Sequence, residues 1–204
     1  MEGQRRSSLK RVTDETEIEI KLTIDGVGDS RINTGIPFFD HLLSSFATHG
    51  LFDLEVDASG DLEVDDHHTI EDLAIALGDA MRDALGDCRG IVRFADVAIP
   101  MDESYATCAI DIDGRGYVVF NGDFPTEKIG DKVSTENISH FFRTFGARAG
   151  INIHASVTGS NSHHMAEALF KALGVALDRA TSIDPRKQGR IPSTKGMMDR
   201  REGA

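Results

Sequence analysis

The stretch DDHHTIEDLAIALG, residues 65–78, and the stretch NSHHMAEALFKALG, residues 161–174, share the pattern HHxxExLxxALG. In each stretch the apolar residues that follow the histidines recur every three or four positions, which is typical of an amphipathic helix. We predict these helices at residues 68–85 and 164–180. A pattern that returns within one chain indicates an internal duplication. We therefore interpret the fold as two copies of one unit.

Further features recur in the same order in the two copies. An Asp-Glu doublet at residues 14–15 and again at 102–103 precedes a strand-like run that ends in Asp-Gly-x-Gly. His41 and His140 each precede a phenylalanine by five positions. The predicted division is a first half at residues 1–95, a second half at residues 96–185 and a C-terminal tail at residues 186–204. Because no linker rich in Pro, Gly or Ser separates the halves, we expect them to pack as one compact body.

Alternating polar and apolar residues indicate the strands. Residues 17–24 place isoleucine and leucine on one face and charged residues and threonine on the other, which predicts a half-buried strand. The same reasoning predicts strands at residues 51–57, 105–112, 117–120 and 151–157 and helices at residues 37–50 and 136–149. Strands with one wet face and short connections favour an α+β fold, with helices packed on one face of mixed or antiparallel sheets, over a doubly wound parallel sheet.

Composition excludes several classes of function. With 40% hydrophobic and 27% charged residues, the 204-residue chain has the composition of a soluble globular protein. Its net charge of −12 argues against a nucleic-acid partner, because such a surface repels phosphate. No apolar run is long enough to suggest a membrane span, and the polar start does not resemble a secretory signal. Cys88 and Cys108 are the only cysteines and lack the spacing of a zinc motif, so we expect a cytoplasmic location.

The two HHxxE motifs have the spacing of metal ligands. His67 and Glu71, four positions apart, lie on one face of a helix and can hold one ion. His68 lies about 100° further around that helix, so we expect it to reach a different ion. One such motif alone is more typical of a polar helix start, whereas two matched copies favour metal binding. The predicted ligands are His41, His67, His68, Glu71, His140, His163, His164 and Glu167. Such nitrogen and oxygen donors suit Mn²⁺, Fe²⁺, Co²⁺ or Zn²⁺.

Five longer motifs resemble those of the imidazoleglycerol-phosphate dehydratase family. They are TGIPFFDHLL at residues 34–43, DDHHTIED at 65–72, PMDE at 100–103, NSHHMAEALFKA at 161–172 and PSTKG at 192–196. The resemblance covers about residues 11–196. The chain departs from it at Gly116, which follows Arg115 where many members of the family have a proline.

The resemblance implies a fold, a metal and an assembly. The implied fold consists of internally duplicated βαβ-type halves and is ribosomal protein S5 domain 2-like. The implied cofactor is Mn²⁺, with two ions per active site held by the eight ligands named above. The implied assembly has 24 subunits with active sites at subunit interfaces, and its partner is a small phosphorylated substrate.

The implied reaction removes water from imidazole glycerol phosphate to give imidazole acetol phosphate in histidine biosynthesis. The hydrogen to be removed lies on a carbon without a neighbouring carbonyl, so direct removal leaves an unstabilised carbanion. Metal ions on both ring nitrogens would stabilise an imidazolate as Lewis acids. Our hypothesis is that the imidazolate expels the hydroxyl next to the ring to form a diazafulvene-like intermediate, after which Glu15 removes the adjacent proton. Glu103 is the counterpart of Glu15 in the second copy. It either occupies the equivalent structural position to that base or is a solvated carboxylate at the end of a strand.

The substrate phosphate needs cations and hydrogen-bond donors. Ser193, Thr194 and Lys195, followed by a glycine, are predicted to form a phosphate clasp in the C-terminal tail. By resemblance we add Arg93 and Arg115 as candidates for substrate binding. We also expect Lys171, on the helix after His163 and His164, to face the site and His49 to line the pocket. His154 lies within a predicted strand and is more typical of a packed or edge residue.

Two alternatives stay open at this point. A two-metal phosphatase or other hydrolase would release inorganic phosphate, although such sites usually contain bridging aspartates that this ligand set lacks. A metal-storage or scaffold protein would have no need of the clasp at residues 193–195.

Overall fold

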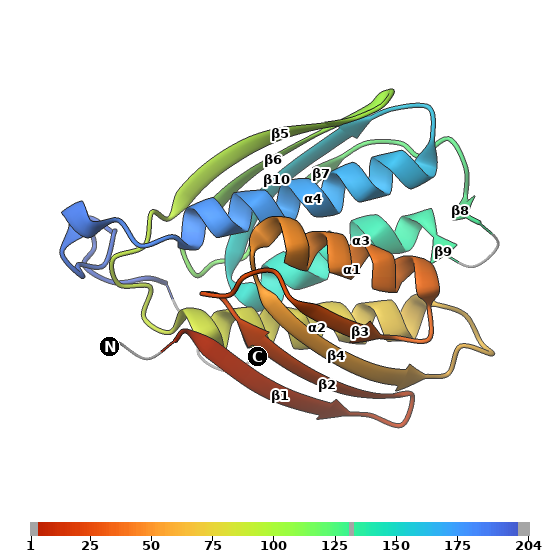
Figure 1. Ribbon diagram of the computed structural model, residues 1–204, viewed down its shortest axis with the longest axis horizontal. Helices are drawn as coiled ribbons and strands as arrows, with labels where there is room; N and C mark the ends of the chain where they lie inside the picture. The colour runs from red at the N-terminus through yellow and green to blue at the C-terminus, as the bar shows by residue number, and fades with distance from the viewer. Residues whose placement is uncertain (1–3, 131–132, 200–204) are drawn as a thin grey trace.

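Each half of the chain builds one four-stranded sheet in the computed structural model, which describes residues 4–130 and 133–199 (Figure 1). The first half contains β1 (Arg6–Val12), β2 (Thr16–Thr23), β3 (Ser30–Asn33), α1 (Pro37–Gly50), β4 (Asp53–Gly60) and α2 (His67–Leu85). The second half contains β5 (Phe94–Met101), β6 (Ser104–Ile112), β7 (Val118–Asn121), α3 (Thr135–Ala149), β10 (Ile151–Thr158) and α4 (Ser162–Thr181). A small hairpin of β8 (Lys128–Ile129) and β9 (Val133–Ser134) precedes α3, and a 3-10 turn η1 (Pro185–Lys187) follows α4. Residues 200–204 of the predicted tail lie outside the described residues.

The two sheets have the same topology. The strand order is β1-β2-β4-β3 in the first sheet and β5-β6-β10-β7 in the second. In each sheet the first three strands are antiparallel and the last, β3 or β7, is parallel to its neighbour. The parallel pair in each sheet encloses a crossover helix, α1 or α3. The predicted α+β fold of two similar halves with mixed sheets is therefore confirmed.

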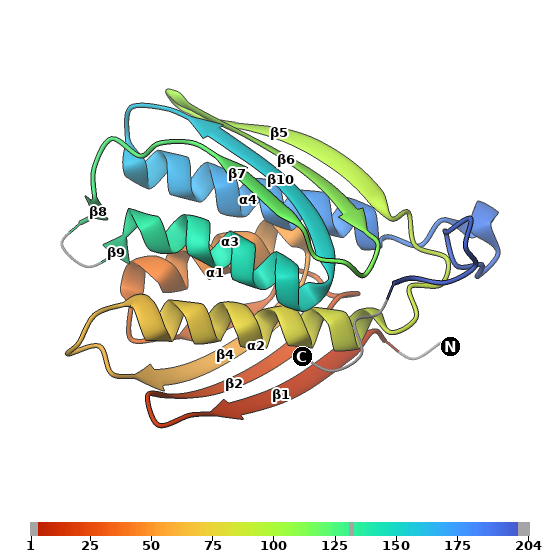
Figure 2. The same cartoon turned by 180° about the vertical axis from the view of Figure 1, so that it is seen from behind.

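The four helices lie between the two sheets. The first sheet covers α1 and α2, the second covers α3 and α4, and the helices meet in the middle (Figures 1 and 2). Within the middle layers α1 packs against α4, and α2 packs against α3. Each helix pair thus joins one half to the other. No helix within residues 4–130 and 133–199 combines the length and the apolar character that crossing a bilayer requires.

The elements with strong periodicity were predicted, and three edge strands were not. All four main helices and the strands β2, β4, β6, β7 and β10 lie within three residues of their predicted positions. β1, β3 and β5 have no clean alternation of apolar residues. β1, for example, turns only the partly buried Leu9 toward the core among its large apolar side chains. Such edge strands are held mainly by backbone pairing with a central strand, and that pairing leaves little signal in the sequence.

Phenylalanine side chains from three helices fill the space between the layers. Fully buried rings from α1, α3 and α4 pack edge to face or tilted against one another: Phe39, Phe141, Phe142 and Phe170. Complete burial of rings of this size contributes a large part of the hydrophobic stabilisation. The packing also explains why both motifs are followed by an apolar helix.

The glycine that ends each HHxxExLxxALG motif lets two helix backbones touch. A Cβ atom on Gly174 of α4 would lie 2.5 Å from the carbonyl oxygen of Phe46 in α1. A Cβ atom on Gly78 of α2 would lie 2.9 Å from the carbonyl oxygen of Phe145 in α3. These phenylalanines are those that follow His41 and His140 by five positions. The repeated glycine therefore sets how closely the helices of opposite halves approach.

We expect Gly174→Ala to destabilise the protein by about 1–3 kcal/mol, because the added methyl group forces α4 away from the backbone of α1. This loss exceeds the gain of up to about 1 kcal/mol that alanine brings to a helix interior. The measurement is the thermal unfolding midpoint at one protein concentration. Asp83→Ala, on the exposed side of α2, is the control and should leave the midpoint nearly unchanged. An unchanged or raised midpoint for Gly174→Ala would contradict the role of the close contact.

Candidate metal centre

The first cluster of potential metal ligands joins α2 to α3. His67 and Glu71 come from α2 and His140 from α3, and one donor atom of each lies within 4.8 Å of the others. Nε2 of His67 is 3.7 Å from Oε2 of Glu71, and Nε2 of His140 is 3.3 Å from Oε1 of the same carboxylate. The two imidazole rings stack with centroids 4.9 Å apart. Both oxygens of Glu71 thus face an imidazole.

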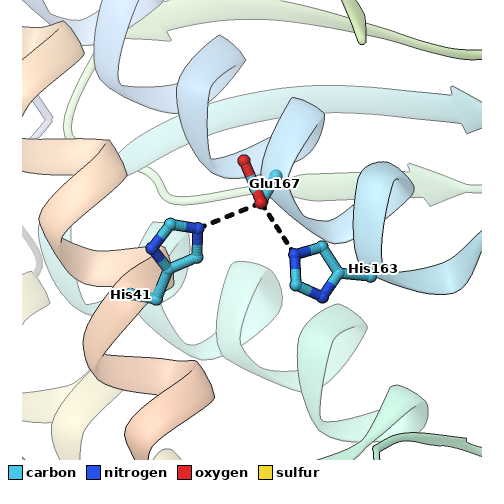
Figure 3. Close-up of side chains that lie close together, drawn as sticks. All are labelled: His41, His163 and Glu167. Carbon is cyan, nitrogen blue, oxygen red and sulfur yellow. Dashed lines mark hydrogen bonds and ion pairs between the residues drawn. The ribbon is translucent and has the colours of Figure 1, made fainter. Parts of the chain in front are cut away.

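The second cluster joins α1 to α4 in the same way. His41 comes from α1, and His163 and Glu167 come from the start of α4 (Figure 3). Oε1 of Glu167 is 3.0 Å from Nε2 of His41 and 2.8 Å from Nε2 of His163. Oε2 of the same carboxylate accepts a hydrogen bond of 2.7 Å from Lys171. Although burial disfavours the charged form of Glu167, the nearby Lys171 and His41 outweigh it and lower the pKa of this carboxyl group to about 2.

Each cluster takes its third ligand from the opposite half. His41 of the first half meets the HHxxE motif of the second, and His140 of the second half meets the motif of the first. This exchange follows from the packing of α1 on α4 and of α2 on α3. In the part of the chain that the structure describes, neither half alone forms a cluster of two histidines and a glutamate, so the halves depend on each other for the site.

The second histidine of each motif stands apart from these clusters. His68 lies 2.9 Å, through Nδ1, from Oδ2 of Asp61, and His164 lies 2.9 Å, through Nδ1, from Oε2 of Glu103. Because a carboxylate only accepts, Nδ1 carries the hydrogen in each case and Nε2 is left to bind elsewhere. The hydrogen bond to the carboxylate raises the pKa of both imidazoles. Within the described residues, then, His68 and His164 each bond a carboxylate through Nδ1 and belong to neither of the two clusters.

The two glutamates of the repeated Asp-Glu doublet have different surroundings. Glu103 bonds to His164 and to the hydroxyl of Ser104, and its hydrogen bond with His164 lowers its pKa to about 2. Glu15 is 53% exposed, and its Oε2 lies 3.8 Å from Nδ1 of His68, too far for a hydrogen bond. In the second half Glu103 accepts the hydrogen bond from Nδ1 of His164. In the first half it is Asp61 that accepts the corresponding bond from Nδ1 of His68.

The residues of the two clusters fit a divalent ion. Each cluster combines two imidazole nitrogens with one carboxylate, a donor set that suits Mn²⁺, Fe²⁺, Co²⁺ or Zn²⁺. Nε2 of His140 is shielded from solvent yet has no hydrogen-bond partner among residues 4–130 and 133–199, although Oε1 of Glu71 is within ion-pair distance. A buried nitrogen of this kind normally has a partner, and a metal ion aligned with its lone pair would supply one. His67 is held in position through Nδ1, which donates to the amide oxygen of Asn137 at 2.9 Å and leaves Nε2 for an ion.

A pocket at the other end of the molecule gathers most of the predicted substrate-binding residues. Five of them line it: Arg93, Arg115, Ser193, Thr194 and Lys195. The cations are partly engaged by carboxylates, because Arg93 pairs with Asp111 at 2.7 Å and Lys195 with Asp199 at 3.1 Å. Arg93 also donates to the carbonyl oxygen of Pro192 at 2.7 Å and so ties the tail to the start of β5. Two guanidinium groups, an ammonium group and two hydroxyls in one pocket are suited to bind an oxyanion.

This pocket lies far from the clusters of the same chain. The backbone N–H of Arg93 donates to the carbonyl oxygen of Ala180 near the end of α4, whereas His163 begins that helix. The helical rise between Ala180 and His163 is about 25 Å. Figures 1 and 2 show the tail beyond one end of α4 and the start of α4 at the other. Lys171, by contrast, touches the second cluster directly.

His49 and His154 lie outside both the clusters and the pocket at residues 193–195. His49 is exposed two turns beyond His41 on α1. Its counterpart in the second half, Arg148, forms an ion pair with Asp79 of α2, so this position faces the far end of the bundle. His154 is exposed on the outer face of β10, beside Arg115 and Tyr117.

The sequence analysis missed the residues that orient the ligands. Asp61 contacts His68, Asn137 contacts His67, and the ring of Phe38 packs against that of His163. Asn137 and Phe38 each precede a cluster histidine by three positions, which places them on the same helix face as that histidine. That spacing was a signal in the sequence. Asp61, in the loop after β4, carried none.

Comparison with known proteins finds similarity to one family of enzymes. The family model for imidazoleglycerol-phosphate dehydratase matches residues 34–177. An imidazoleglycerol-phosphate dehydratase from Methanococcus maripaludis is 56% identical over 95% of this chain and all of its own length. One from Methanothermobacter thermautotrophicus is 53% identical over 95% of this chain and 98% of its own length. The crystal structure of the Staphylococcus aureus enzyme is 34% identical with a TM-score of 0.79, covering 88% of this chain and 99% of that one.

We expect Glu103→Gln to lower the pKa of His164 toward the ordinary histidine value, because the variant removes the anionic acceptor that favours the imidazolium form. NMR titration of the imidazole resonances in the metal-free protein measures this pKa. Glu17→Gln, on the outer face of the first sheet, is the matched control and should leave His164 unchanged. A pKa of His164 that is the same in Glu103→Gln and in the unaltered chain would contradict the hydrogen bond.

Proposed function

Because this chain belongs to the imidazoleglycerol-phosphate dehydratase family, we propose that it converts imidazole glycerol phosphate to imidazole acetol phosphate and water with two Mn²⁺ ions per active site. Membership makes the chain an enzyme, a hydro-lyase of histidine biosynthesis acting on a small molecule. The observation that carries the two-metal proposal is the pair of His-His-Glu clusters, each built across the two halves. We also propose a cytoplasmic location, consistent with a chain of only two cysteines.

Six residues would hold the two ions within one chain. They are His67, Glu71 and His140 in the first cluster and His41, His163 and Glu167 in the second. Divalent ions bound there would act as Lewis acids and stabilise negative charge on the imidazole ring of the substrate. The two carboxylates neutralise part of the metal charge, and Asn137 keeps the ring of His67 in a fixed orientation.

A complete site on this proposal requires more than one copy of the chain. The oxyanion pocket and the clusters of one chain are separated by the length of α4, and the short glycerol chain of the substrate cannot bridge that separation. His68 and His164 also stand outside the two clusters, with Nδ1 bonded to a carboxylate and Nε2 left without a hydrogen. We propose that these histidines complete clusters in neighbouring copies and that the pocket of one copy faces the clusters of another. Sites at subunit interfaces in an assembly of 24 chains meet both requirements.

Glu15 is the proposed general base. Its side chain is more exposed than that of Glu103, 53% against 36%, and it makes no hydrogen bond to His68, so its carboxylate is available to accept a proton. The carboxylate of Glu103, by contrast, already accepts a hydrogen bond from His164. We therefore assign Glu103 a positioning role toward His164 and the proton transfer to Glu15.

The pocket around residues 193–195 is the proposed phosphate site. Ser193 and Thr194 offer hydroxyl donors, and Arg93, Arg115 and Lys195 offer positive charge. Each of these cations is paired with an aspartate, so a phosphate monoester would compete with those carboxylates for its charged partners. Because Lys171 contacts Glu167 of the second cluster, we propose that it acts near the reacting end of the substrate rather than near its phosphate.

Removal of metal should abolish the reaction. We expect the chelated enzyme to form no ketone from imidazole glycerol phosphate and Mn²⁺ to restore its formation, because the ring anion then regains its stabilisation. The assay follows the enolisable ketone product and inorganic phosphate in parallel, with Mg²⁺ as the control addition. Release of phosphate in place of ketone would indicate a two-metal hydrolase, and full activity after chelation would contradict the two-metal proposal.

Glu15→Gln should lower kcat by about 10²–10⁴-fold, because the amide cannot accept the proton. Its Mn²⁺ content, measured by metal analysis after gel filtration, should equal that of the unaltered enzyme. Glu103→Gln is the matched variant from the other half and should lower Mn²⁺ content by weakening the orientation of His164. Normal turnover by fully metal-loaded Glu15→Gln would refute the assignment of the base.

A further inference from the structure

The carboxylate of Glu167 is divided between two kinds of partner. Its Oε1 faces the two imidazoles of its cluster, and its Oε2 accepts from Lys171. The side chain of Glu167 is 8% exposed and that of Lys171 is 21% exposed, so solvent screens their attraction only weakly. Sδ of Met101 lies 3.3 Å from the ammonium nitrogen and helps to enclose it. Lys171 therefore fixes the carboxylate so that one oxygen is left for an ion.

Glu71 has no such restraint. Its two oxygens face His140 and His67, and no Lys or Arg forms an ion pair with it within the described residues. The position four residues beyond it, where Lys171 stands relative to Glu167, is occupied by Ile75. Both oxygens of Glu71 thus remain available to an ion, and the cluster keeps its full negative charge.

The histidines of the two clusters are also oriented differently. His67 donates from Nδ1 to the buried amide of Asn137. At the corresponding place in the second cluster, the ring of Phe38 lies 4.6 Å from that of His163 and offers no acceptor. A hydrogen bond of the first kind fixes the ring and makes the other nitrogen a better donor, and its loss typically costs about 10–100-fold in metal affinity.

From these differences we propose that the two metal sites are not equivalent. The cluster of Glu71 binds its ion more tightly and fills first, and Lys171 weakens the cluster of Glu167 by occupying one carboxylate oxygen and placing a positive charge beside the ion. This proposal rests on the two-metal function proposed above. Burial of Glu167 strengthens its attraction to an ion, but it strengthens the competing attraction to Lys171 as well, and the lysine stays covalently attached to the site.

Titration of the chelated full-length protein with Mn²⁺ tests the proposal, with free Mn²⁺ measured by its electron paramagnetic resonance signal. We expect two classes of site, one of each per chain, whose dissociation constants differ by about tenfold or more. Lys171→Met should tighten the weaker class and bring the two together, whereas Lys171→Arg, which keeps the charge, should preserve the difference. Asn137→Ala should weaken the tighter class by about 10–100-fold and leave the other in place.

Ile75→Met, at the matching position of the first half, is the control and should leave both classes unchanged. Two equal sites in the unaltered protein would overturn the inference and leave the two-metal proposal intact. The same conclusion would follow if Lys171→Met kept the original difference in affinity. Failure of any form to bind Mn²⁺ stoichiometrically would overturn the two-metal proposal itself, and this inference with it.

Discussion

Contact between helix backbones of opposite halves is the constraint on which the rest of the structure depends. Gly174 lets α4 approach the backbone of α1, and Gly78 does the same for α2 and α3. At this separation Nε2 of His41 on α1 lies 3.0 Å from Oε1 of Glu167 on α4. The buried phenylalanines between the layers hold the helices in that register. A stable core and a metal-binding geometry thus have the same physical cause.

Duplication gives the molecule two similar sites, and small differences between the copies give the matched residues different surroundings. The second half has Glu103 beside His164, and the first has Asp61 beside His68. The first half therefore keeps Glu15 available for chemistry. Lys171 and Asn137 likewise have no chemical counterpart in the other half, where Ile75 and Phe38 stand in their places. On our proposals, divergence of the halves separated a base from a positioning carboxylate and a tight metal site from a weaker one.

Much of this architecture could be predicted from local patterns, and the remainder depended on tertiary packing. The repeated motif, the main helices and the spacing of His67 and Glu71 are properties of a single helix, so periodicity was sufficient. Which half supplies the third ligand is decided by the packing of α1 on α4, and no sequence pattern expresses that. The edge strand β1 depends on pairing with β2. The bond of Asp61 to His68 depends on the path of a loop, which also leaves no pattern.

The central claim is that two divalent ions bind where these helices cross. Its most direct test is anomalous diffraction at the manganese absorption edge from crystals grown with Mn²⁺. Our account predicts two peaks per chain, one within bonding distance of His41, His163 and Glu167 and the other within bonding distance of His67, Glu71 and His140. Peaks only at the exposed group of Asp102, Glu103 and His164, or no peak at either cluster in a fully loaded crystal, would contradict it.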